Sequence, residues 1–213
     1  MLMLSLSTDT GARFEVDPFA AATEVARYSF EDLEDQDADL LPDDWVRRKG
    51  PGFPSYVKSR IDDGDSFHEQ RSLLVRVNGG RMTYYSPFNN SVGRIDPSFN
   101  YVFRGHVRTD SLQYDAAMYS VSFLNAKRQR IQRFVTKPVT GTHRKWVRLE
   151  IGPLKPHPDV RFVVIGCHVV HQERQDIRGE VRFDDLWLGK LPRLTLVSDA
   201  RAHYLTPDQP VQI

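Results

Sequence analysis

The sequence predicts an all-β fold, an antiparallel jelly-roll β-sandwich. From about residue 70 onward, short runs of alternating or all-apolar residues follow one another, with turn residues between them. Helical periodicity is almost absent. Many short strands at this spacing are typical of a sandwich of two antiparallel sheets.

The composition is that of a globular domain. The chain has 213 residues, of which 40% are hydrophobic and 27% are charged, enough to build a real core. The formal net charge is +1, so the bulk charge does not favour nucleic acid or an anionic membrane. No apolar run is long enough to span a bilayer. We therefore expect no nucleic-acid partner and no membrane insertion.

The first part of the chain, residues 1–24, is expected to be an N-terminal segment outside the sandwich. The best helical candidate is Asp17–Tyr28, although its end also has the pattern of a strand. Two irregular segments follow. Glu31–Trp45 is acidic, and Lys49–Tyr56 is rich in glycine and proline. Long loops on a β-sandwich are where binding usually occurs.

The next strands are recognised by alternation. Residues 72–77 place their core side chains on one parity, and Asn78-Gly79 then gives a strong hairpin signal. Residues 100–110 also alternate, with Gly105 in an inward position. A glycine there suggests close approach by a neighbouring backbone or a large side chain.

Three further strands are expected at residues 116–124, 146–151 and 159–170. The last is apolar on both parities in its middle, which predicts a central strand covered on both sides. The predicted sandwich module spans residues 25–196. Residues 197–213 have the pattern of a linker followed by the start of a further domain, or of a disordered tail.

The last strand, Gly179–Gly189, changes phase halfway along. Its apolar residues at 181 and 183 fall on one parity, and those at 186 and 188 fall on the other. Asp184 and Asp185 stand at the break. A slip of one residue in an alternating strand is a β-bulge, which leaves a residue unpaired and turns its side chain.

Two adjacent carboxylates repel each other unless a cation or a basic group compensates. A calcium ion, which takes six to eight oxygen ligands, is one candidate for that role. The alternative is that Asp184 or Asp185 pairs with a nearby arginine such as Arg182 or Arg27. The residues alone leave both possibilities open.

Four motifs occur in a characteristic order along the chain. They are Phe30-Glu31, Tyr101–Thr109 with Gly105 at its centre, Trp146–Leu149, and Gly179–Leu188 with the aspartate pair. This order resembles the jelly-roll carbohydrate-binding modules of the family 4, 9 and 22 type, in the galactose-binding-like superfamily. The resemblance covers roughly Val25 to Leu188.

The resemblance implies a structural calcium that ties the first strand to the last. Glu31, Asp184 and Asp185 match the positions that supply its side-chain ligands. Two features depart from the family pattern. The early loop offers Asp43-Asp44-Trp45 in place of a Gly-Trp pair, and the sugar-binding aromatic residues of the family have no clear counterpart.

Sugar binding needs flat aromatic faces beside polar groups that bond hydroxyls. The candidates are Trp45, Tyr56, Tyr85, Phe88, Arg104, His106 and Tyr114. Each could instead be a solvated strand residue or a loop anchor. A concave face with two or more exposed aromatic residues would favour sugar, whereas short polar and charged side chains there would favour a protein-interaction role.

The function expected from these features is a non-catalytic carbohydrate-binding module. Such a module would be part of a larger extracellular, periplasmic or cell-surface protein, with polysaccharide or oligosaccharide and the other domains of the chain as partners. The alternative is a structural or protein-interaction β-sandwich domain with no sugar ligand. No nucleophile elbow, phosphate-binding loop, zinc-protease motif or dinucleotide fingerprint occurs, so we expect no enzyme. The basic run Lys127–Phe134 is expected to be a hairpin with solvated charges.

Overall fold

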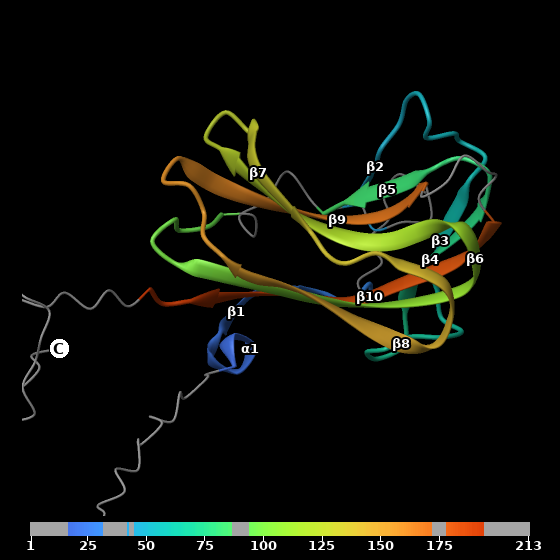
Figure 1. The fold of residues 1–213 in the computed structure, drawn as a ribbon, viewed down its shortest axis with the longest axis horizontal. Helices are drawn as coiled ribbons and strands as arrows, with labels where there is room; N and C mark the ends of the chain where they lie inside the picture. The colour runs from blue at the N-terminus through green and yellow to red at the C-terminus, as the bar shows by residue number, and fades with distance from the viewer. Residues whose placement is uncertain (1–16, 32–41, 43–44, 87–93, 172–177, 194–213) are drawn as a thin grey trace, which may run out of the picture.

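The computed structural model describes residues 17–31, 42, 45–86, 94–171 and 178–193. Almost all of their regular structure is strand (Figure 1). The elements are α1 (Pro18–Ala21), β1 (Thr23–Tyr28), β2 (Val46–Arg47), β3 (Lys58–Asp62), β4 (Ser72–Asn78), β5 (Met82–Tyr85), β6 (Asn100–Asn125), β7 (Arg130–Val135), β8 (Val139–Leu154), β9 (Val160–His171) and β10 (Arg178–Leu191). Within these residues, no helix has the length and apolar character needed to cross a membrane.

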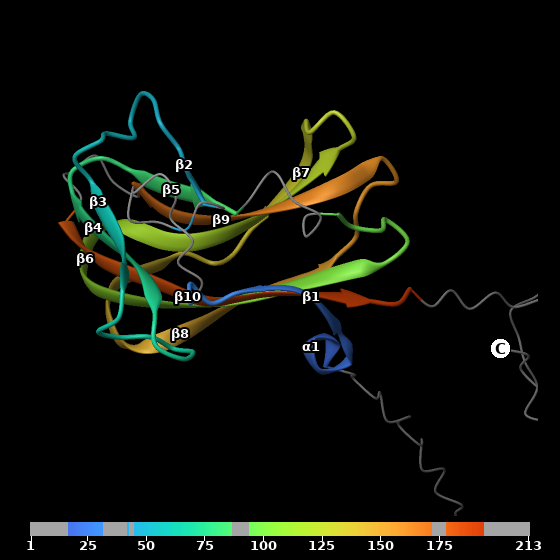
Figure 2. The ribbon, with the colours of Figure 1, turned by 180° about the vertical axis from the view of Figure 1, so that it is seen from behind.

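The strands form two layers that share one long strand, β6. The first half of β6 pairs with β10 and β8, and the second half pairs with β9 and β7. In the β10 layer, β4 pairs with the first half of β10 and β3 pairs with β4, while β1 pairs with the second half of β10. The β9 layer continues from β9 to β5 and then to β2 (Figures 1 and 2). Every pairing between these strands is antiparallel, so the predicted jelly-roll β-sandwich is confirmed.

The continuity of β6 differs from the expectation of separate strands at residues 100–110 and 116–124. Ser111 and Tyr114 have φ angles of 52° and 59°, and the chain bends there from one layer into the other. Because the pairing shifts register on both sides of this bend, the ladder continues without a loop. At the bend, β6 passes from one sheet to the other. The alternation of apolar and polar residues does not reveal this change.

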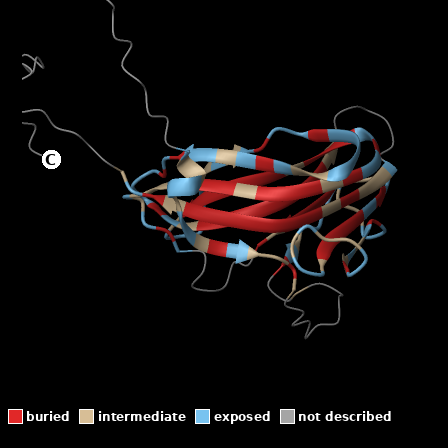
Figure 3. Cartoon of the chain, turned by 90° about the horizontal axis from the view of Figure 1, so that it is seen from below, coloured by how far each residue is buried: buried red, intermediate tan, exposed pale blue. Residues whose placement is uncertain are grey.

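The core lies between the two layers, where inward side chains of both halves of β6 meet. Phe103 from the first half and Tyr119 from the second have ring centroids 5.3 Å apart, and Tyr119 is also 5.3 Å from Phe183 of β10. All three side chains are at most 1% exposed. Strands β4, β5, β6, β9 and β10 are buried along most of their length, whereas β1, β3, β7 and β8 are largely exposed (Figure 3). As predicted, β9 is a central strand, between β5 and β6.

The N-terminal segment resolves into one helical turn and a strand. Asp17 accepts a hydrogen bond from the Phe19 amide at 3.0 Å, and Pro18 begins the helix, so α1 starts in the way that capping rules predict. The strand pattern prevails from Thr23, two residues before the predicted boundary of the module at residue 25. The segment 197–213 lies outside the described residues.

The glycine expected in an inward position lies where predicted, against a large side chain. A Cβ atom added to Gly105 would be 2.8 Å from the ring of Tyr119. We expect Gly105→Ala to lower the free energy of unfolding by about 1–3 kcal/mol, since this buried ring has no room to move away. Chemical denaturation measures the change. In the control Gly64→Ala, the nearest atom would lie at 3.6 Å, so that variant should resemble the wild type. Equal stability of the two variants would contradict the packing described here.

Candidate functional site

The aspartate pair of β10 forms the predicted bulge. The register between β10 and β6 shifts between Asp184 and Trp187, and Asp185 has a φ angle of 46°. The apolar residues on both sides of the break, at 181, 183, 186 and 188, are all at most 1% exposed. The slip therefore keeps both halves of the strand facing the same core, and it turns the two aspartates away from that core.

Asp184 holds a loop with its carboxylate. Its Oδ2 accepts hydrogen bonds from the backbone amides of Phe67 at 2.7 Å and His68 at 2.9 Å, and its Oδ1 accepts one from the Asp185 amide at 2.6 Å. Burial raises the pKa of Asp184 to about 6, although these three bonds favour the ionised form. Glu31 holds the same loop, because its Oε1 accepts hydrogen bonds from the backbone amides of Gln70 and Arg71.

Asp185 is compensated by basic side chains. Its Oδ1 lies 2.5 Å from Nη1 of Arg27 on β1, and its Oδ2 lies 3.3 Å from Nδ1 of His106 on β6. Burial alone would raise the pKa of Asp185, but His106 and the Arg27 guanidinium hold the pKa of this carboxyl below its usual range. Of the two arginines considered from the sequence, Arg27 is the partner, whereas Arg182 pairs with Asp62 at 3.1 Å.

The three acids do not fit a calcium site in this arrangement. Glu31 and Asp184 have their hydrogen-bonded oxygens turned toward backbone amides, and both oxygens of Asp185 face cationic or imidazole nitrogens. Within the described residues, no group of three or more His, Cys, Asp or Glu side chains could hold a metal ion. The acids from both ends of the sandwich do converge as expected, but they converge on one loop, Phe67–Arg71. The calcium itself stays a prediction from the resemblance.

Two of the predicted ligand residues lie on the outer side of the β10 layer and are already engaged there. His106 is 5% exposed because the ring of Phe67 stacks on it, with ring centroids 3.5 Å apart. The guanidinium of Arg104 lies 4.7 Å above the ring of Trp187. His106 is therefore covered by the protein's own side chain, whereas Arg104 is partly exposed and engaged with Trp187.

The outer side of the β9 layer is different, since short side chains make up its middle. One cross-strand row runs Val46, Tyr85, Gly166, Ser120 and Val135, from β2 across to β7. Directly opposed residues of antiparallel strands share a face, so these five lie side by side. Ser120 is fully buried, Tyr85 is partly exposed and the two valines at the ends are about half exposed. The ring of His168 lies on the same face and fills the space over Gly166, since a Cβ added there would be 2.5 Å from its Nε2.

A small groove of about 180 Å³ lies on this face. It is lined by Tyr85, Ser122, Leu124, Arg128, Arg130 and Val164. The β6–β7 hairpin, which carries the two arginines, rises at one end of the layer (Figure 1). The basic run Lys127–Phe134 is thus part of a hairpin, as expected, but its arginines also line the groove. Sequence reasoning missed that second role.

The turn of the hairpin is fixed by Asn125. Its side-chain oxygen accepts hydrogen bonds from the amides of Lys127 and Gln129, both at 2.9 Å. Arg128 at the tip has a φ angle of 59°, and its guanidinium lies 5.6 Å from the centre of the Phe162 ring. These contacts hold the arginine beside the groove in advance of any ligand.

A hydrogen-bonded histidine lies at the centre of this face, with its ring over Gly166. Nδ1 of His168 is 3.0 Å from the Thr83 hydroxyl, and its Nε2 is 2.7 Å from the Ser120 hydroxyl and 3.4 Å from Arg133. Burial lowers the pKa of His168 to about 3, with the charges of Arg133 and Arg48 acting in the same direction. The imidazole is therefore neutral at physiological pH and serves as a fixed partner for two hydroxyls.

The remaining predicted ligand residues are scattered over the fold. Trp45 is 8% exposed and packs against Tyr28 and Phe30 in the core, so it has no free ring face to offer a sugar. Tyr114, 41% exposed, lies at the bend of β6, and Tyr56 is 63% exposed before β3. Phe88 lies outside the described residues. Of the predicted ligand residues that the structure describes, only Tyr85 lines the groove.

The same fold occurs in solved family 22 carbohydrate-binding modules. The C-terminal module of Clostridium thermocellum Xyn10B shares 12% identity with this chain, with 79% of this chain and 95% of that chain covered and a TM-score of 0.51. The CBM22-2 xylan-binding domain of Paenibacillus barcinonensis Xyn10C shares 13% identity, with 78% and 99% covered and a TM-score of 0.51. The expected resemblance is thereby confirmed for the fold.

A third match places such a module in a longer chain. The CBM22-1–GH10 structure of C. thermocellum Xyn10B, complexed with xylohexaose, shares 15% identity with a TM-score of 0.52, and the match covers 83% of this chain but 30% of that one. No protein-family model matches the present chain, and no curated protein matches it in sequence.

Chelation tests directly whether Glu31, Asp184 and Asp185 need a calcium ion, because all three have partners within the protein. We expect that removing divalent ions with EGTA leaves the thermal midpoint unchanged, because Arg27 and backbone amides already balance the carboxylates. Differential scanning calorimetry in EGTA and in excess calcium measures this. A midpoint several degrees higher in calcium, with the gain abolished in Glu31→Ala, would establish the calcium site and contradict this arrangement.

Proposed function

We propose that this domain is a non-catalytic carbohydrate-binding module, and that it binds polysaccharide or oligosaccharide along the outer side of the β9 layer. The observation that carries the proposal is the groove between Tyr85 and the β6–β7 hairpin, on a fold shared with carbohydrate-binding modules. The structures that share the fold are described as xylan-binding or are complexed with xylohexaose, so xylan is the first ligand to test.

The groove has the chemistry that sugar rings need. A tyrosine ring offers an apolar face to sugar C–H groups and a hydroxyl at its edge. Arg128 and Arg130 supply several N–H donors for sugar hydroxyls. The buried residues Ser122, Leu124 and Val164 complete the lining of the groove. The aromatic content is modest, and most of the polar contacts would come from arginine.

The buried histidine at the centre of this face is unsuited to catalysis. Ser120 and His168 are in hydrogen-bond contact, as a nucleophile and its base would be. However, both side chains are at most 2% exposed, and the third partner is the Thr83 hydroxyl in place of an orienting carboxylate. A histidine with a pKa of about 3 is also a weak base at neutral pH. These features support a role in holding the face rigid.

As a module, the domain would act by holding a partner close to its substrate. One fold match is to a structure in which a module is joined to a GH10 module. We infer that the present domain is likewise part of a longer exported or cell-surface protein. Binding to polysaccharide would raise the effective concentration of the attached domain there without any new chemistry.

Affinity gel electrophoresis in soluble xylan and in other neutral polysaccharides tests this proposal. We expect Tyr85→Ala to weaken retention about tenfold or more, since loss of one stacked ring costs about 1–3 kcal/mol. The control His143→Ala removes an exposed ring on β8 and should leave retention unchanged. Retention of wild type and Tyr85→Ala to the same extent would contradict the groove. If no polysaccharide retains the wild type, the result would favour the alternative, a protein-interaction domain with no sugar ligand.

A further inference from the structure

A second, larger cavity lies at the edge of the sandwich, where the β9 layer and the β10 layer each end. Its volume is about 650 Å³. It is lined by residues of β2, β3, β4 and β5 and of the segments beside them: Arg47, Lys49, Ser55, Val57, Lys58, Ser59, Arg60, Leu74, Arg76 and Tyr84. Because β2 and β3 are the two ends of the strand order, the cavity is open to solvent along an edge. We call it the edge cavity.

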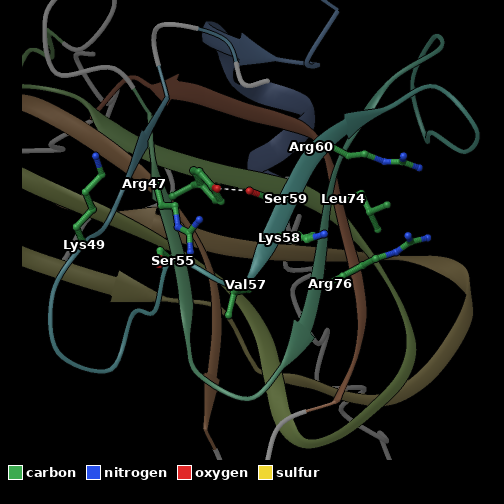
Figure 4. Close-up of a pocket in the computed structure, with 10 residues that line it drawn as sticks. Arg47, Lys49, Ser55, Val57, Lys58, Ser59, Arg60, Leu74 and Arg76 are labelled. Atoms are coloured by element: carbon green, nitrogen blue, oxygen red, sulfur yellow. Dashed lines mark hydrogen bonds between the residues drawn. The ribbon is translucent and has the colours of Figure 1, made fainter. Parts of the chain in front are cut away.

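The lining of the edge cavity is strongly basic. Five of its ten residues are arginine or lysine, and none is acidic. Figure 4 shows Arg47 and Lys49 on one side of β3 and Arg60 and Arg76 on the other, with Lys58 on β3 between them. For a chain of net charge +1, this is a local concentration of positive charge.

Only part of this charge is neutralised by neighbouring acids. Arg60 pairs with Asp62 at 2.7 Å, and Arg76 pairs with Glu180 at 2.6 Å. Lys49 and Lys58 have no acidic partner within the described residues, and Arg47 donates to the Pro54 carbonyl. Like charges gathered without acids between them repel one another, so an anion bound among them is favoured.

The rest of the lining suits a ring-shaped polar ligand. The side chains of Val57 and Leu74 are buried and give an apolar surface, while the hydroxyls of Ser59 and Tyr84 contact each other at the wall (Figure 4). The segment that contributes Val57 also carries Tyr56, which is 63% exposed. The volume falls in the usual range for small-molecule sites, which is larger than a bare phosphate or sulfate ion needs.

We propose that the edge cavity binds an acidic saccharide, with the carboxylate of a uronic acid among Arg47, Lys49 and Lys58. Guanidinium and ammonium groups bind carboxylates through charge-assisted hydrogen bonds, which are stronger than bonds to neutral hydroxyls. This site lies apart from the Tyr85 groove, since it shares no lining residue with it. The inference therefore goes beyond the proposed function and stands or falls separately.

Isothermal titration calorimetry with trigalacturonate tests the proposal. The variant Lys49→Ala/Lys58→Ala removes two exposed charges that have no acidic partner within the described residues, so the fold should persist, and the thermal midpoint checks this. The matched control Arg144→Ala/Lys145→Ala removes the same charge from exposed positions of β8. We expect the edge-cavity variant to bind at least tenfold more weakly and the control to bind within twofold of wild type. Raising NaCl from about 20 to about 300 mM should weaken wild-type binding by a similar factor.

Further measurements distinguish binding in the edge cavity from binding elsewhere on the protein. Tyr85→Ala should bind trigalacturonate as the wild type does, and xylohexaose should not compete for the edge cavity. Loss of trigalacturonate binding in Tyr85→Ala would place the ligand in the other groove and overturn the proposal. Equal weakening in the β8 control would show attraction to charge in general and overturn it too. Inorganic phosphate that displaces trigalacturonate at equal concentration would overturn the assignment to a saccharide.

Discussion

The bulge at Asp184 and Asp185 is the constraint on which the rest of the fold depends. β10 lies between β6 and β4 in its first half and between β6 and β1 in its second, so it needs core residues on one side throughout. One inserted residue keeps that alignment and leaves two buried carboxylates to be balanced. Asp184 is balanced by three backbone amides, and Asp185 by Arg27 of the first strand and His106 of the long central strand. These side-chain and backbone contacts join the two ends of the sandwich.

The same network decides which side of the molecule is available to ligands. The loop held by Asp184 and Glu31 lays Phe67 on His106, and ion pairs of Arg182 with Asp62 and Asp65 fasten its beginning. The part of the outer side of the β10 layer around His106 is in this way occupied by internal contacts. The β9 layer has a different surface, with short side chains in its centre and the arginines of a hairpin beside them. Binding is therefore assigned to the groove beside the β6–β7 hairpin and to the edge cavity.

The sequence was sufficient for the fold class and the bulge, because these follow from the parity of core residues. The meeting of the first and last strands was implied by the resemblance to carbohydrate-binding modules, and the structure confirms it. The sequence was insufficient where the chain bends without losing its alternation, so that β6 was expected as two separate strands. The alternation of residues also does not distinguish a buried aromatic side chain from an exposed one. Trp45 was for this reason predicted to bind sugar, although it is buried. Arg128 and Arg130 were visible as charges in a hairpin, but their position beside Tyr85 depends on pairing between β5, β9 and β6, which are distant in sequence.

The most direct test of this network is amide hydrogen exchange of the Phe67–Arg71 loop, measured by NMR with and without EGTA. If carboxylates bind this loop as described, the amides of Phe67, His68, Gln70 and Arg71 exchange slowly although Phe67 is 47% exposed, and chelation leaves their rates unchanged. Rapid exchange of these four amides in the native protein, or protection that disappears when divalent ions are removed, would contradict the claim that protein groups alone join the ends of the sandwich.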